Sequence, residues 1–182
     1  MLFFGHLGIT LGLFLGFGIL IPRLRVLIDP RYLAIGALLP DLIDKPVGRI
    51  IFASMLANGR IIGHTLLFTL FFALIGVYLY EKNKDYRGFA LASGSFLHLL
   101  EDQMWTQPLT LFWPLFGLSF PRDSTDYTGL EYLLRMFEKS FEPEFSQTFI
   151  AEILGIGIIT IFAANWIKTR LSKKNFDGIK GQ

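Results

Sequence analysis

Residues 2–21 read LFFGHLGITLGLFLGFGILI, a run that is apolar apart from His6 and one threonine. The hydrocarbon core of a bilayer is about 30 Å thick, and a helix of about 20 residues crosses it. Gly8, Gly12 and Gly16 recur every four residues and therefore lie on one helical face, where small residues let a second helix approach closely. The run predicts a membrane-spanning helix packed against another helix.

The composition of the whole chain agrees with a membrane protein. Of the 182 residues, 52% are hydrophobic and 18% are charged, whereas soluble domains contain about 25% charged residues. The length suits a single domain. The chain contains no cysteine, which excludes disulfides and thiolate metal sites. A net charge of +2 gives no basic footprint for nucleic acid, so we expect no nucleic-acid partner.

Four further segments are candidates for membrane helices. Residues 61–80 and 147–167 are long enough to cross a bilayer, and residues 87–105 are small and apolar until His98. Residues 32–43 are too short for a full crossing and predict a half-spanning or re-entrant helix buried in protein. We therefore expect an all-α, polytopic helical bundle with about five membrane segments, one of them short.

The segment between the last two apolar runs is different in character. Residues 106–146 are rich in prolines and aromatic residues, and within them residues 126–140 carry apolar side chains at helical spacing. Such spacing predicts an amphipathic helix at the membrane surface or over a site. Residues 168–182 are basic and polar and predict a tail. Residues 1–167 are expected to form one membrane-embedded domain.

Each of the three histidines lies beside carboxylates or at the end of an apolar segment. Imidazole and carboxylate are ligands that a borderline divalent metal prefers. Ionisable groups within or at the ends of apolar segments are costly and usually functional. His98 and Asp102 are four residues apart and share a helical face. The candidate metal ligands are His6, Asp41, Asp44, His64, His98 and Asp102.

The lysines and arginines give a prediction of orientation. If the candidate ligands meet at one membrane face, the short segment 32–43 must return the chain to the face of His6. The opposite face then holds 11 of the 17 lysines and arginines. Because cytoplasmic loops carry the excess of basic residues, that opposite face is expected to be cytoplasmic. The N-terminus and the site would then lie outside the cell membrane and the tail in the cytoplasm.

The same residues carry a resemblance to a known family. His6, Pro40-Asp41 with Asp44, Arg60 with His64, His98 with Asp102, and Trp113-Pro114 follow one another in the order found in the YdjM-like family of membrane-bound, metal-dependent hydrolases. The resemblance covers residues 1 to 115. The family is remotely similar to the zinc-dependent phospholipase C and single-strand nuclease group, which implies an all-α fold and phosphoester chemistry.

The resemblance and the ligand types together predict an integral membrane hydrolase. It would cleave a phosphoester or related bond of a lipid or lipid-linked substrate with a metal-activated water. Zinc is the expected ion, and the number of candidate ligands suits one ion or two. Asp44 and Arg60 are the candidate catalytic residues: Asp44 as a bridging ligand or a neighbour of the ligands, and Arg60 as a bidentate phosphate contact.

Other interpretations stay open at the level of sequence. Histidine and aspartate within a membrane also mark ion pathways, so a metal-ion transporter or channel is one alternative. A non-enzymatic protein with a structural metal is another, and it predicts a closed coordination sphere. Taken singly, Arg60 could be a topological anchor, Pro40-Asp41 a turn or helix cap, and Trp113-Pro114 part of an interfacial aromatic belt.

Overall fold

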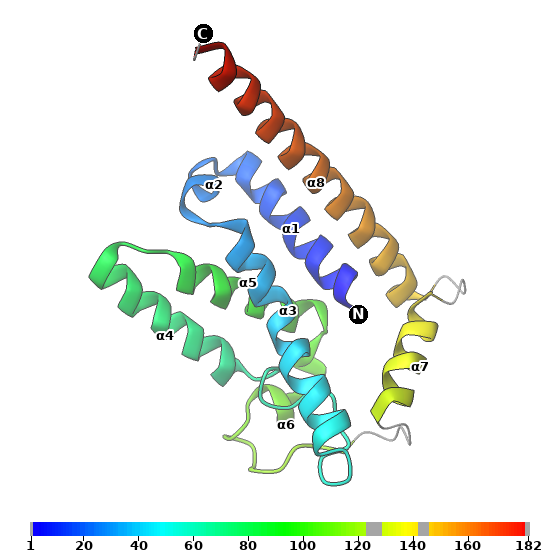
Figure 1. The fold of residues 1–182 in the computed structure, drawn as a ribbon. Coiled ribbons are helices and arrows are strands. Elements are labelled where there is room, and N and C mark those ends of the chain that lie inside the picture. Colours follow the sequence, from blue (N-terminus) through cyan, green and yellow to red (C-terminus); the bar gives the residue numbers. More distant parts are fainter. Residues whose placement is uncertain (1, 123–128, 142–145, 181–182) are drawn as a thin grey trace.

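A computed structural model of the chain describes residues 2–122, 129–141 and 146–180, with the backbone alone for residues 139–140 and 169–180. Every regular element in these ranges is helical, which confirms the all-α prediction (Figure 1). The elements are α1 (Phe3–Leu20), α2 (Arg23–Leu27), α3 (Pro30–Pro46), the π-helix η1 (Val47–Ile51), α4 (Leu66–Asn83), α5 (Arg87–Glu101), the 3₁₀ turn η2 (Met104–Thr106), α6 (Pro108–Leu111), α7 (Gly129–Phe141) and α8 (Gln147–Lys180).

Three of the described helices are long and apolar enough to cross a membrane: α1, α4, and α8 as far as Lys168. Helices α3 and α5 have 17 and 15 residues and do not reach that standard. Helix α3 is longer than the predicted segment 32–43 because Asp29 caps it, accepting a hydrogen bond of 2.9 Å from the Arg31 amide. The described part of the chain therefore carries three candidate membrane-spanning helices, and the total of about five segments stays a prediction.

Helices α1 and α8 run side by side along one edge of the molecule (Figure 1). Their closest approach is at Gly8 and Gly155, where a Cβ on either glycine would collide with the backbone of the other helix. The buried Glu152 of α8 accepts hydrogen bonds from the backbone amides of Leu2 at 2.6 Å and Phe4 at 3.1 Å. Because amides in the first turn of a helix have no partner inside it, Glu152 satisfies them and fixes the start of α1.

Helices α3 and α5 form the centre of the bundle, and α4 packs on the outer side of α5. A Cβ at Gly36 of α3 would collide with the Leu91 carbonyl oxygen, and one at Gly94 of α5 would collide with the Leu33 carbonyl oxygen. The two backbones therefore touch, as small residues allow in membrane bundles. This contact brings the C-terminal half of α3, with Asp41 and Asp44, close to the end of α5.

Two helix boundaries differ from the sequence prediction in a way that matters for the site. Helix α4 begins at Leu66, not at residue 61, because the Thr65 hydroxyl caps it by accepting from the Phe68 amide at 3.1 Å. Residues 61–65 consequently form a loop. Helix α5 ends at Glu101, and the left-handed Gln103, with φ of +52°, turns the chain. Both changes place ligand candidates at helix ends, where the backbone is free to bend.

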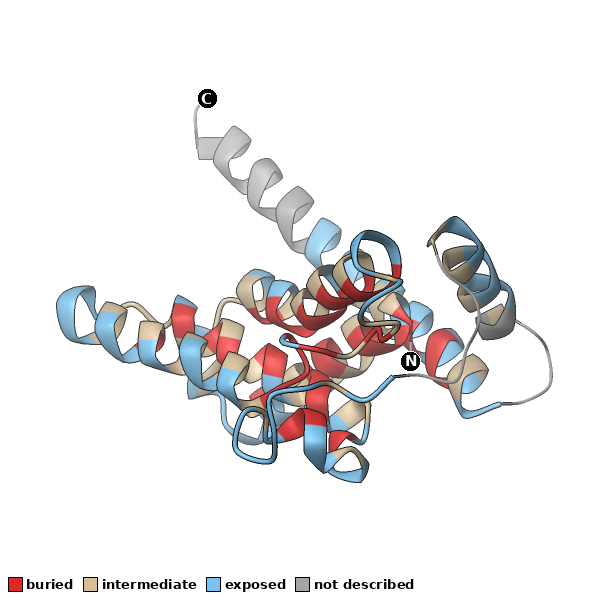
Figure 2. Cartoon of the chain, turned by 90° about the horizontal axis from the view of Figure 1, so that it is seen from below, coloured by how far each residue is buried: buried red, intermediate tan, exposed pale blue. Residues whose placement is uncertain are grey.

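Buried residues gather in the middle of the molecule, where the helices meet, and exposed residues lie on its outer sides (Figure 2). The three histidines, Asp44 and Glu152 have no exposed surface, whereas large apolar side chains on the spanning helices are open, including Leu74 at 61%. Apolar surface facing outward and buried polar groups are the arrangement that a bilayer favours.

Helix α7 confirms the predicted helix between the last two apolar runs, and residues 126–128 of that prediction lie outside the described part. It packs against α8 and η1. Tyr132 of α7 lies 4.7 Å below the Arg49 guanidinium, a cation–π contact. Helix α8 continues to Lys180, past the predicted end at residue 167. The interfacial position of α7 and the cytoplasmic position of the tail stay predictions.

Candidate metal centre

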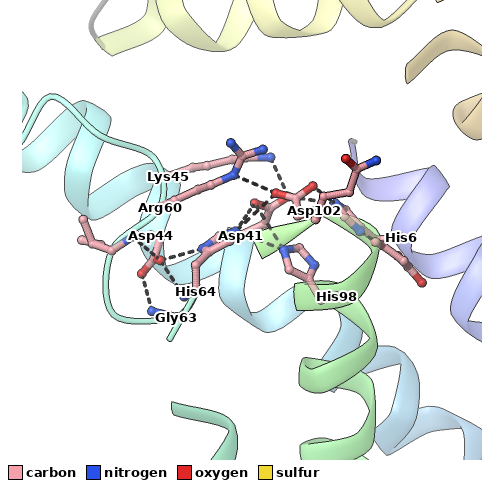
Figure 3. A network of polar contacts seen from close by, with 12 residues as sticks. His6, Asp41, Asp44, Lys45, Arg60, Gly63, His64, His98 and Asp102 are labelled. Carbon is pink, nitrogen blue, oxygen red and sulfur yellow. Dashed lines mark hydrogen bonds and ion pairs between the residues drawn. The ribbon is translucent and has the colours of Figure 1, made fainter. Parts of the chain in front are cut away.

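Three imidazole rings meet in the middle of the bundle, each from a different element. His6 comes from the first turns of α1, His64 from the loop before α4, and His98 from the last turn of α5 (Figure 3). The His6 and His98 rings stack with centroids 3.9 Å apart, and the His64 Nε2 lies 3.1 Å from the His98 Nε2. None of the three has exposed surface. Residues far apart in the sequence therefore form one buried cluster.

The outer nitrogen of each ring has an acceptor. The Nδ1 atoms of His6, His64 and His98 lie 2.7 Å from a Glu101 carboxylate oxygen, an Asp44 carboxylate oxygen and the Ala37 carbonyl oxygen, respectively. A carbonyl or ionised carboxylate oxygen only accepts, so each Nδ1 carries the proton. In the neutral rings the Nε2 atoms then carry lone pairs, and all of these point inward. This is the arrangement that metal-ligating histidines almost always show.

Two aspartates complete the inner ring of donors. One Asp102 oxygen lies 3.3 Å from the His6 Nε2, and one Asp41 oxygen lies 3.6 Å from the His64 Nε2 and 3.8 Å from the His98 Nε2. Two overlapping sets of close donor atoms result, His6 with His98 and Asp102, and His64 with His98 and Asp41. Donors held about 2.0–2.1 Å from a tetrahedral ion lie about 3.3 Å from one another, which matches these separations.

The polar atoms of the cluster fit a divalent cation. The lone pairs of the His64 and His98 Nε2 atoms face each other at 3.1 Å, and such a contact is repulsive unless a positive charge lies between or beside them. The buried His6 Nε2 has no hydrogen-bond partner among the described residues. Since a buried acceptor without a partner costs free energy, a cation bound to these nitrogens removes both penalties.

Asp44, predicted as a ligand or its neighbour, is directed toward the loop. Its carboxylate accepts from the backbone amides of Ile61 at 2.7 Å, Gly63 at 2.8 Å and His64 at 3.1 Å, in addition to the His64 Nδ1. Four donors occupy its oxygens. Through these contacts Asp44 holds the loop of residues 61–64 in its conformation and orients the His64 ring.

Glu101 belongs to the polar network around the histidines, although its place in the sequence did not mark it as a candidate. Its carboxylate joins the His6 Nδ1 to the Thr10 hydroxyl, which donates at 2.9 Å. Both partners lie on α1, one turn apart. The signal was present in the sequence: His6 and Thr10 are the polar residues of an otherwise apolar helix, and they are four residues apart on one face.

Two cations hold the outer oxygens of the inner aspartates. Lys45 donates to one Asp41 oxygen at 2.5 Å, while the other Asp41 oxygen faces the histidines. Arg60 donates from Nε to one Asp102 oxygen at 2.8 Å, while the other faces His6. Each aspartate thus links a cationic side chain to the imidazole cluster, and the Arg60-bound oxygen of Asp102 also lies 3.7 Å from the His64 Nε2. The Arg60 side chain is 36% exposed and marks the open side of the site.

The charges around the cluster favour a bound cation. Burial alone would raise the pKa of Asp102, but His6, His64 and Arg60 hold that pKa well below its usual range. Burial alone would lower the pKa of His64, yet the nearby Asp102 and Asp44 carboxylates raise it above its ordinary value. Ionised carboxylates therefore make this position attractive to positive charge, whether a proton or a metal ion.

The structure brings five of the six predicted ligands together: His6, Asp41, His64, His98 and Asp102 (Figure 3). Arg60 lies beside them through Asp102. The Trp113-Pro114 element has its contacts elsewhere, since the Trp113 indole donates to the Leu118 carbonyl oxygen and the ring stacks on Phe120. A pocket of about 490 Å³, lined in part by Arg60, Glu101 and Asp102, lies beside the cluster.

A family model described as YdjM inner membrane protein matches residues 1–171, and the chain therefore belongs to this family. The match covers all the residues of the cluster and all the helices that position them. Comparisons with curated proteins and with solved structures found no match to this chain.

Proposed function

We propose that this protein is an integral membrane, metal-dependent hydrolase that cleaves a phosphoester or related bond in a lipid or lipid-linked molecule. The observation that carries the proposal is the convergence of three buried imidazoles and two aspartates beside an open polar pocket. His6, Asp41, His64, His98 and Asp102 would hold the ion, and imidazole with carboxylate is the ligand set expected for zinc.

When bound at such a site, a divalent cation supplies Lewis acidity toward a phosphoryl oxygen and makes water a better nucleophile at neutral pH. Hydrolysis adds water across the ester: a new P–O bond forms, the bond to the leaving oxygen breaks, and a proton passes from the water to that oxygen. The side chains of the site have separate parts in this reaction. Asp44 and Glu101 keep the imidazole lone pairs directed inward, and the tightly held Lys45 restrains Asp41.

Arg60 is suited to bind the substrate. Its guanidinium uses Nε on Asp102, and the partly exposed side chain borders the pocket. A planar guanidinium binds phosphate oxygens through paired hydrogen bonds and stabilises the negative charge of the transition state. Asp44, whose oxygens are occupied by the loop, acts through His64 and is a positioning residue.

The orientation of the protein is part of the proposal. The loops around Arg25 and Arg87 lie together at the end of the bundle away from the cluster, where they border a common pocket. Under the positive-inside rule, this basic end would face the cytoplasm and the site would lie at the extracytoplasmic face. A lipid substrate would then reach the site from the outer leaflet.

Two observations favour an enzyme over the alternatives. A transporter needs a path beyond the site toward the other face, whereas α3 and α5 make backbone contact at Gly36 and Gly94 just beyond His98. A structural metal needs a closed coordination sphere, whereas Asp102 and Arg60 border a pocket. Liposomes loaded with a metal-sensitive dye give a direct check, since the proposal predicts no metal flux.

The test of the proposal is phospholipid hydrolysis by the purified protein. The protein is loaded with zinc, its metal content is measured, and the products from mixed phospholipid vesicles are identified by mass spectrometry with and without chelator. We expect products that disappear with chelator and in His98→Ala. The control is Leu100→Ala, a change of an exposed apolar residue on the same helix that should keep both metal and turnover. A full metal complement without hydrolysis of any ester or phosphoester would defeat the proposal.

A second variant separates substrate binding from metal binding. Arg60→Gln removes the guanidinium but none of the five inner donors, so the metal should be retained. Turnover at low substrate concentration should fall about tenfold to a hundredfold, because a charge-assisted pair with phosphate is lost. An unchanged ratio of kcat to KM would remove Arg60 from the substrate site.

A further inference from the structure

A long apolar groove on the outer surface borders the pocket that lies beside the candidate metal centre. The groove lies between α1 and α8, has a volume of about 610 Å³, and is lined by α1 residues from Ile9 to Leu20 and by Leu154 and Ile158 of α8. The polar pocket beside Arg60 and Asp102 is bordered by the same Ile9 and Leu154. The two spaces therefore share these two side chains as a common border.

The glycines of α1 explain why the groove exists. At Gly8 the two helices are in backbone contact with Gly155. One turn further a Cβ at Gly12 would meet only the end of the Ile158 side chain, at 3.0 Å, and one turn beyond that a Cβ at Gly16 would meet nothing within 4 Å. The two helices thus touch near the site, at Gly8, and leave a space between them toward the C-terminal end of α1. The glycine spacing that predicted helix packing serves that purpose at Gly8 and lines a groove at Gly16.

The length and chemistry of the groove match one lipid chain. From Ile9 to Leu20 the helix rises about 16 Å at about 1.5 Å per residue, close to half of the ~30 Å hydrocarbon core. Both walls belong to helices long and apolar enough to span a membrane. Next to its Ile9 end lies the pocket lined by Gln103, Gln147 and Arg60, whose polar side chains can bind a polar head group. A packed partner helix would account for the apolar part but not for the polar pocket that borders it.

We propose that the α1–α8 groove holds one acyl chain of a phospholipid whose head group lies in the polar pocket beside Asp102. This inference rests on the proposed function for the reaction at the head group, but the binding of the chain is separate from it. The substrate class is then a diacyl or monoacyl phospholipid that enters sideways from one leaflet. Filling the groove would lower the affinity for long chains and leave the metal centre intact.

Photo-crosslinking in vesicles tests the binding directly. The zinc-loaded protein is placed in phosphatidylglycerol vesicles that contain a small share of phosphatidylglycerol with a diazirine at the end of one acyl chain, and labelled peptides are mapped. The exposed face of α4 around Leu70 and Leu74 reports ordinary lipid contact. We expect residues 13–20 to be labelled in excess of this face.

Matched variants make the test specific. Gly16→Phe places a ring in the groove, at a position where a Cβ meets nothing within 4 Å. Gly157→Phe places the same ring on the exposed part of α8, where a Cβ also meets nothing within 4 Å. Gly16→Phe should lower the labelling of residues 13–20, relative to α4, about tenfold, and Gly157→Phe should leave it unchanged. Gly16→Leu, a smaller change, gives the same direction if the phenylalanine variant inserts poorly.

The outcomes separate this inference from the proposed function. Equal labelling of α1 and α4 in the parent protein, or labelling unaffected by Gly16→Phe, would overturn the groove assignment, and so would crosslinks showing a second copy of the chain seated there. If the protein hydrolyses nothing but the labelling follows the expected pattern, the lipid site stands and the enzyme proposal fails. Where hydrolysis is observed, Gly16→Phe should reduce turnover of long-chain substrates and spare short-chain ones.

Discussion

The two halves of the candidate metal centre orient a histidine in the same way but in different structural settings. In the loop half, made of Asp41, Asp44 and His64, the carboxylate that orients the histidine also binds three backbone amides. In the helix half, made of His6, Glu101 and Asp102, the orienting carboxylate binds only two side chains of α1. Both place a carboxylate oxygen 2.7 Å from an Nδ1 atom.

The difference shows which half depends on the rest of the fold. Asp44 contacts residues 17 to 20 positions away, so the loop half is assembled within one short stretch of chain. Glu101 contacts residues 91 and 95 positions away, so the helix half forms only when α1 docks on α5. Because α1 is itself held by α8 at Gly8 and Glu152, docking of the α1–α8 pair completes the site.

The largest effect is expected from breaking the loop half with Asp44→Asn. An amide offers one acceptor oxygen in place of two, so at least one buried backbone N–H among residues 61–64 would face another donor. We expect a loss of at least about 3 kcal/mol in unfolding free energy together with loss of metal binding. Thermal unfolding in detergent, followed with and without added zinc, measures both. A variant as stable as the parent would show that the loop does not depend on Asp44.

The corresponding change in the helix half, Glu101→Gln, should be milder and more selective. Glutamine keeps the shape, can accept from the His6 Nδ1, and can donate to the Thr10 hydroxyl, but it lacks the negative charge. We therefore expect near-normal stability and a metal affinity reduced about 10- to 100-fold. A competition titration with a coloured zinc chelator gives the affinity. If Glu101→Gln unfolds the protein as severely as Asp44→Asn does, the contrast between the halves is wrong.

A third comparison tests the dependence of the helix half on α8. Gly8→Ala places a methyl group against the Gly155 backbone, whereas Gly16→Ala places one in open space. The first should destabilise the protein by about 1–3 kcal/mol through overpacking, and the second should have little effect. Disulfide crosslinking between cysteines introduced in α1 and α8 should become slower in Gly8→Ala alone. Equal behaviour of the two alanine variants would argue against close helix contact at Gly8.

Much of the fold followed from the length and apolarity of the segments. The helix over residues 2–21 and the last apolar run are present with nearly the predicted starts, because bilayer length and composition set them. The start of α4 was missed by five residues. Asp44 competes for the amides of residues 61–64, and this tertiary contact is invisible to a local pattern.

The sequence was sufficient to predict which residues gather in the candidate site, but not which contacts each of them makes. Residue type and position were sufficient to nominate the inner donors, since buried histidine and aspartate have few other uses in a membrane protein. The division into inner donors and orienting carboxylates was not predictable. It depends on the side-chain directions of Asp44 and Glu101, which residue type and spacing do not give.

The measurement that tests the account most directly is the X-ray absorption spectrum of the zinc-loaded protein, recorded beside that of His98→Ala. The central claim is that imidazoles from α1, the loop before α4, and α5 bind one cation centre. We predict nitrogen and oxygen neighbours at about 2.0–2.1 Å with strong imidazole scattering, reduced or absent in the variant. Zinc bound without imidazole ligands, or a spectrum unchanged by His98→Ala, would contradict it.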